Sequence, residues 1–117
     1  MADSHPTIST HVLDLETGRP AAGFPVALFR LRDDGTPRLV AEARTDAEGR
    51  VRSLLRGRLA AGDYQIVFDL AAWLAEEARE PPFFENMAIG FRVDDPERSY
   101  HIPLLVSPFG LSTYRGS

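Results

Sequence analysis

Residues 7–31, TISTHVLDLETGRPAAGFPVALFRL, hold two alternating segments with a turn-rich stretch between them. In the first segment Ile8, Thr10 and Val12 fall on one face of an extended chain, and His11 falls on the other, which predicts a strand with one buried face. The second segment repeats the period of two, and the glycines and proline between the segments predict a turn. Short strands joined by turns are therefore the expected pattern of the chain.

This pattern continues to the C-terminus. DDGTP and DAEG are turn sequences, and further strand segments are RLVAEART, RVRSLL, GDYQIVFDL, MAIGFRV, SYHIPLLVS and LSTYRG. Turn sequences recur every 8 to 12 residues or so, which is typical of an all-β sandwich or barrel. We expect seven or eight strands, roughly the number in known sandwiches.

One segment has helical spacing. In DLAAWLAEEAREPP, residues 69–82, Leu70, Trp73 and Leu74 recur three to four residues apart. Asp69 is suited to cap the start of a helix, and Pro81-Pro82 to stop it. The sequence therefore predicts one short helix of about ten residues.

Length and composition limit the class of protein. A chain of 117 residues fits a single domain, 1–117, in which we expect residues 1–6 to be flexible. The net charge is −4 and the basic residues are scattered, which argues against nucleic-acid binding. Without cysteine there can be no disulfide or thiolate metal site. No segment has the ~20 apolar residues that span a bilayer, nor a secretory leader, so we expect no membrane association and a cytoplasmic location.

The histidines are the first candidates for chemistry. Of the three, His11 and His101 lie in the middle of alternating strands. Each could be a partly buried histidine with one hydrogen bond, or the two could meet in a shared cleft as general acid and base. Histidine spacing typical of zinc sites is missing, and the acidic residues cluster in turns and on the helix, so we expect no metal.

Two further residues each allow two interpretations from the sequence alone. Arg50 could be a solvated arginine at a strand edge, or a clamp on a carbonyl, carboxylate or oxyanion. Pro103 removes a backbone donor from a strand, so that strand should be an edge or line a gap.

Four motifs together resemble a known family. These are STHVLDLETGRPAAG, TDAEGR, YHIPLLVSP and the terminal STYRGS. From about Ile8 to Ser117 the chain resembles the transthyretin-related proteins, and among them the 5-hydroxyisourate hydrolases. Ser99 and Leu111 depart from the histidine and tyrosine that are common at these positions.

The resemblance implies a fold, an assembly and a reaction. The fold is a transthyretin-like β-sandwich of two four-stranded sheets with one short helix. The assembly is a homotetramer with active sites at the dimer–dimer interface. The reaction is hydrolysis of 5-hydroxyisourate to 2-oxo-4-hydroxy-4-carboxy-5-ureidoimidazoline, on the route from urate to allantoin, without a cofactor.

The same resemblance assigns roles to residues. The catalytic set is His11, Arg50, His101 and Ser117, and substrate-binding residues are His11, Arg50, Tyr114 and Arg115. His101, oriented by Ser117, would activate water while Arg50 stabilises the oxyanion and His11 protonates the leaving nitrogen. The two histidines could exchange roles. The alternatives are a non-enzymatic transthyretin-like protein that binds a small ligand, and a structural or adhesive β-sandwich.

Overall fold

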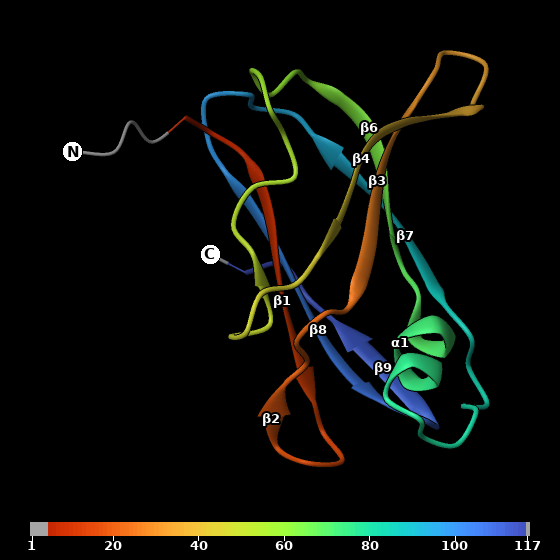
Figure 1. Ribbon diagram of the computed structural model, residues 1–117. Helices are drawn as coiled ribbons and strands as arrows, with labels where there is room; N and C mark the ends of the chain where they lie inside the picture. The colour runs from red at the N-terminus through yellow and green to blue at the C-terminus, as the bar shows by residue number, and fades with distance from the viewer. Residues whose placement is uncertain (1–4, 117) are drawn as a thin grey trace.

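The computed structural model describes residues 5–116, which form two facing sheets and one helix (Figure 1). The predicted all-β sandwich is confirmed. The strands are β1 (Ile8–Asp14), β2 (Arg19–Pro20), β3 (Pro25–Leu31), β4 (Pro37–Arg44), β5 (Arg50–Val51), β6 (Gly62–Phe68), β7 (Met87–Val93), β8 (Tyr100–Ser107) and β9 (Gly110–Thr113), and the helix is α1 (Leu70–Glu76).

The two sheets differ in strand number. One has the order β4-β3-β6-β7, and the other the order β2-β1-β8-β9 with β5 also paired to β1. The expectation of two four-stranded sheets was therefore one strand short for the second sheet. The strands β2 and β5 have two residues each, too few for an alternating pattern to reveal them.

The strands β1 and β8 pair in parallel, although they come from opposite ends of the chain. Their register sets Ser9 beside His101, and His11 beside Pro103. The other strand pairs that the structure describes are antiparallel. The parallel pair is what brings the first and last motifs of the sequence into one place.

The core between the sheets is closed at one end by the helix. Phe24 packs edge-on against Phe68, with ring centroids 6.3 Å apart, and against Trp73 of α1 at 5.3 Å. The Trp73 indole nitrogen donates to the Ala22 carbonyl oxygen at 2.8 Å. Aromatic burial and this hydrogen bond together hold α1 against the sandwich.

The helix begins where the sequence predicts and ends earlier. Asp69 caps it, because its carboxylate accepts the Ala72 amide at 3.0 Å. Its last residue is Glu76, and Ala78 then adopts a left-handed φ of 55°. The prediction that Pro81-Pro82 stop the helix was wrong, because the chain has already left it. Among the described residues, no helix is long and apolar enough to cross a membrane.

The turn after the helix has the geometry of a Schellman motif. The Arg79 amide donates to the Leu74 carbonyl at 2.9 Å, and the Ala78 amide donates to the Ala75 carbonyl at 3.1 Å. Glycine is the usual residue at the left-handed position, and here it is Ala78. The turn places the Arg79 side chain over the Trp73 ring, 5.1 Å from its centroid.

Arg79 also binds the end of β1. Its guanidinium donates to the buried carboxylate of Asp14 at 2.9 Å and contacts Glu16 as well. Burial alone would raise the pKa of Asp14, but the Arg79 hydrogen bond, with those from the Glu16 amide and the Thr17 hydroxyl, lowers it below its usual value. The helix end and β1 are thus joined by a partly buried ion pair.

Candidate active site

The candidate site lies on the outer face of the five-stranded sheet. Along β1 the residues alternate between buried and half-buried, and Ser9 and His11 belong to the half-buried set. On β8 His101 is half-buried between two buried neighbours. Both histidines are therefore half-buried, with their rings on the outer face of the sheet.

A tight turn fixes Arg50 at the start of β5. The Asp46 carboxylate accepts the amides of Glu48 at 2.9 Å and Arg50 at 3.0 Å, and these bonds, the one from Arg50 first, lower the pKa of Asp46. Gly49 follows with a φ of 80°, and a β-carbon there would stand 2.5 Å from the Val12 carbonyl oxygen. Only glycine lets the turn approach β1 this closely. Arg50 then pairs directly with His11.

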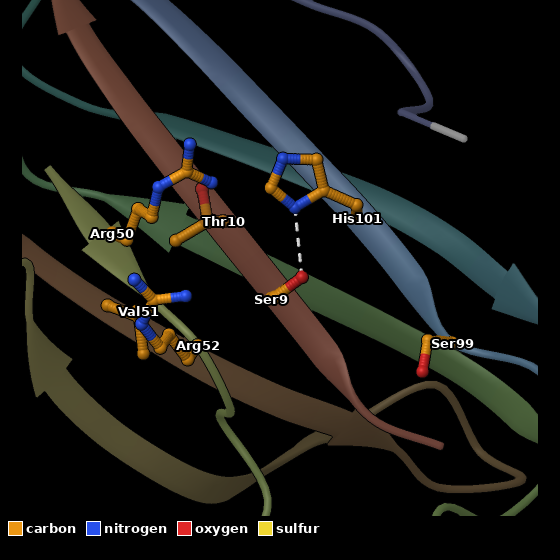
Figure 2. Close-up of a pocket in the computed structure, with 7 residues that line it drawn as sticks. All are labelled: Ser9, Thr10, Arg50, Val51, Arg52, Ser99 and His101. Carbon is orange, nitrogen blue, oxygen red and sulfur yellow. Dashed lines mark hydrogen bonds between the residues drawn. The ribbon is translucent and has the colours of Figure 1, made fainter. Parts of the chain in front are cut away.

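The His101 ring has a defined hydrogen-bond partner. Its Nδ1 lies 2.9 Å from the Ser9 hydroxyl oxygen, and Figure 2 shows the other ring nitrogen pointing away from Ser9. Burial, followed by the positive charges of Arg50 and His11, lowers the pKa of His101 below its usual value. At neutral pH the ring is therefore neutral and able to accept a proton.

His11 is held differently. Its Nε2 lies 2.9 Å from the Glu48 carbonyl oxygen, which can only accept, so Nε2 carries the proton. The ring of His11 is thereby tied to the turn that also fixes Arg50. Its Nδ1 is the nitrogen left for other partners.

Arg50 and His101 line one cavity of about 350 Å³ (Figure 2). They come from strands on either side of β1, and β1 forms its floor. The full lining is Ser9, Thr10, Arg50, Val51, Arg52, Ser99 and His101. A guanidinium and a neutral imidazole in one polar cavity can bind a heterocycle with several oxygens and remove a proton beside it.

The terminal motif is placed partly apart from this cavity. Tyr114 and Arg115 line a second cavity of about 350 Å³ with Ile89 and Phe91, and this cavity also touches His101. The Arg115 guanidinium lies over the Tyr100 ring, 5.0 Å from its centroid. Contact of Tyr114 and Arg115 with substrate stays a prediction, and Ser117 lies outside the described residues.

Pro103 lies where the pairing between β8 and the C-terminal segment is interrupted. The strand β8 is not an edge, because it lies between β1 and β9. Its pairing with β9 ends at Leu104 and Thr113, and resumes only as an isolated bridge between His101 and Gly116. The Thr113 hydroxyl donates to the Pro103 carbonyl at 2.7 Å in this interval. The alternative that Pro103 lines a gap in the ladder is therefore correct.

Only Arg50 and His101 of the lining were predicted as site residues, and two polar members that sequence reasoning missed are Ser9 and Arg52. Each lies two residues from a predicted site residue on the same strand face or its continuation, so the alternating period could have pointed to both. The partner of Ser9 could not be found in this way, since it is 92 residues distant.

Comparison with known proteins identifies the family. The chain matches the HIUase/Transthyretin family over residues 8–116. It is 42% identical to a 5-hydroxyisourate hydrolase of Caulobacter vibrioides over 113 residues, which cover 94% of this chain and 97% of that protein.

Solved structures agree. A 5-hydroxyisourate hydrolase of Klebsiella pneumoniae superposes with a TM-score of 0.83 at 38% identity, covering 96% of this chain and 99% of that one. A transthyretin from Sparus aurata gives a TM-score of 0.85 at 28% identity, covering 93% and 95%. Fold, site and relatives together show that this chain belongs to the HIUase/transthyretin family.

Proposed function

We propose that this chain hydrolyses 5-hydroxyisourate to 2-oxo-4-hydroxy-4-carboxy-5-ureidoimidazoline, in the oxidative breakdown of urate to allantoin. The 5-hydroxyisourate hydrolases that it resembles over almost its whole length support this function. The observation that carries the proposal is the polar cavity in which the Arg50 guanidinium accompanies a neutral His101.

The reaction adds water to a lactam carbonyl and opens the ring. His101 takes a proton from water as the oxygen bonds to the carbonyl carbon, and the carbonyl oxygen becomes negative. Arg50 donates hydrogen bonds to that oxygen, which stabilises the charge as it develops. When the oxyanion collapses, the carbon–nitrogen bond breaks and the nitrogen must gain a proton.

We assign His11 to the leaving nitrogen. It pairs with Arg50 across β1 and β5, and its ring is fixed through Glu48. To take this role the ring must carry a proton on Nδ1 as well as on Nε2. Nδ1 gives its proton to the leaving nitrogen, and the proton that His101 took from water returns to His11 through solvent, so both rings end as they began. Tyr114 and Arg115 would close the site on the side of the second cavity.

A spectroscopic assay tests the activity. Urate oxidase generates 5-hydroxyisourate from urate in the cuvette, and the purified protein is added while the ultraviolet absorbance is followed. We expect decay much faster than the spontaneous reaction, and a loss of at least about a hundredfold in kcat for His101→Asn. Saturable binding of the compound without faster decay would refute the hydrolase and favour a binding protein of the transthyretin kind.

We also propose that the protein is a homotetramer, with active sites where dimers meet. The strands β7 and β9 are edges of their sheets, and exposed edges pair readily with another chain. Large aromatic side chains are exposed nearby at Phe83, Phe84 and Phe109. Light scattering after gel filtration would test this, and a monomer with full activity would refute it.

The proposed setting follows from the reaction. A single catalytic domain that takes a small soluble metabolite would act in the cytoplasm, and cell fractionation with an activity assay tests that location.

A further inference from the structure

Ser9 and His101 are neighbours because of the parallel register of β1 and β8. Residues directly aligned on adjacent strands lie about 5 Å apart and share a face of the sheet. The Ser9 hydroxyl oxygen therefore reaches His101 Nδ1, at 2.9 Å (Figure 2). Both residues are on regular strands, so neither position depends on a loop.

We propose that Ser9 is the positioning residue of the site: it holds His101 with the proton on Nδ1, and so leaves Nε2 unprotonated toward the substrate. A neutral imidazole has one N–H and one acceptor nitrogen, and a serine hydroxyl can pair with either. The proposal takes the direction in which Nδ1 donates to the Ser9 oxygen, because a general base needs Nε2 as its acceptor. This direction rests on the proposed hydrolase function, but the ring tautomer can be measured without any activity.

A hydroxyl suits this role better than a carboxylate. A carboxylate on Nδ1 would favour the imidazolium ion and raise the pKa of His101. The Ser9 hydroxyl aligns the ring without adding negative charge, so the effect of burial and of Arg50 persists. The ring stays neutral at the pH where the base must act.

The opposite side of the ring is closed by Gly116. A β-carbon on Gly116 would stand 2.6 Å from His101 Cδ2. The glycine therefore lies against the Cδ2 side of the ring, whereas Ser9 contacts the Nδ1 side. Turning the ring over would bring this carbon to Ser9 and break the hydrogen bond. The Ser9 hydrogen bond therefore selects one ring orientation, and Gly116 limits how far the ring can move.

The expectation that Ser117 orients His101 stays a prediction, because Ser117 lies outside the described residues. Among the described residues, the partner at Nδ1 is Ser9. One nitrogen accepts or donates one strong in-plane hydrogen bond. A terminal group acting on this ring would therefore have to approach Nε2.

The test combines ring NMR with kinetics on the full-length protein. Histidine labelled with ¹⁵N gives only three sets of ring signals, from His5, His11 and His101, which His→Asn variants assign. We expect His101 to be protonated on Nδ1 near neutral pH. In Ser9→Ala we expect the proton to move largely to Nε2, with kcat lowered about tenfold and KM changed less, as for the loss of one orienting hydrogen bond.

A matched pair of variants separates loss of the hydroxyl from disturbance of the strand. Ser9→Thr keeps the hydroxyl and Ser9→Val has the same shape without it, and both residues favour strands. Thr should restore the tautomer and kcat, and Val should behave like Ala. Ser107→Ala is the control, since its hydroxyl donates to the Gly110 carbonyl at the other end of β8.

The outcomes separate this proposal from the function. An Nε2-protonated His101 in the native protein, or an unchanged tautomer in Ser9→Ala and Ser9→Val, would overturn the role of Ser9 whatever the activity. A tautomer that follows the Ser9 hydroxyl in a protein without hydrolase activity would support the role of Ser9 and refute the proposed function.

Discussion

Gly116 lies against the imidazole of His101 so closely that a β-carbon on the glycine would stand 2.6 Å from Cδ2 of the ring. Its amide also donates to the His101 carbonyl oxygen at 2.8 Å, so Gly116 contacts both the backbone and the ring of His101. A methyl group cannot fit there unless the ring or the tail moves. Gly116 thus fixes the position of the His101 ring and backbone.

We expect Gly116→Ala to lower kcat by about tenfold or more, because a shift of about 1 Å in a catalytic group can cost a hundredfold. Steady-state kinetics and the His101 ring signals measure the effect. Gly57→Ala is the control, since nothing lies within 4 Å of a β-carbon there. Wild-type kcat in Gly116→Ala would show that the tail can yield without disturbing His101.

Arg50 is expected to affect both the rate and its pH dependence. Its charge helps to hold the pKa of His101 below the usual value of 6.5, so kcat/KM should rise with pH below 6.5 and level off near neutral pH. Arg50→Gln removes this charge, so the rise of kcat/KM on the acid side should move to higher pH. The maximal rate should also fall. Arg50→Lys should leave the pH of this rise unchanged and still lower the rate, because the forked guanidinium donor is gone.

A pH–rate series for the native protein, the two variants and Arg38→Gln measures this effect. Arg38 is exposed on β4 in the other sheet. Acid limbs that coincide in native protein and Arg50→Gln would contradict the electrostatic coupling of Arg50 to His101.

Arg79 is expected to matter for stability. Arg79→Met leaves the Asp14 carboxylate, whose side chain is 4% exposed, without its charged partner, which should cost about 2–4 kcal/mol of unfolding free energy. The pKa of Asp14 is lowered in the fold, so this contribution is present above about pH 4 and lost as the pH falls through the lowered value.

Urea unfolding at equal protein concentration and several pH values provides the measurement. Arg92→Met is the control, because the Arg92–Asp63 pair is 79% and 62% exposed and should contribute about 0–1 kcal/mol. A difference between native protein and Arg79→Met that stays constant down to acid pH would contradict the role of Asp14.

Ala78 offers a stabilising substitution. Its φ of 55° is unfavourable for a residue with a β-carbon, and Ala78→Gly should raise the unfolding free energy by about 0.5–1 kcal/mol. Gly23→Ala is the reciprocal case, because Gly23 has a φ of 75° with open space around it and should lose a similar amount. Thermal or urea unfolding of both variants decides, and a destabilised Ala78→Gly would be the contrary result.

The sequence predicted the strands well where one face is buried. Ile8, Thr10 and Val12 mark β1, and the same period marks β3 and β8. It failed for β2 and β5, which are too short to show a period. It also failed at the end of α1, because a left-handed alanine gives no compositional sign of a helix end.

The sequence names candidate site residues, but it does not give their geometry. Alternation places His11 and His101 on an outer face, yet it does not say which strand lies beside which. The parallel pairing of β1 with β8 joins strands that are far apart in the sequence, and it depends on the packing of both sheets. Ser9 could therefore be seen as a neighbour of His11, and only the register shows it as the partner of His101.

The pairing of β1 with β8 has a consequence for folding. Ser9 and His101 are 92 residues apart, so their contact closes a loop that spans most of the chain. Such contacts carry the highest entropy cost of closure and tend to form late. We therefore expect the Ser9–His101 contact to form only when the chain has nearly finished folding, and a fragment that lacks either residue cannot contain it. During refolding, recovery of activity should lag behind the appearance of sheet structure.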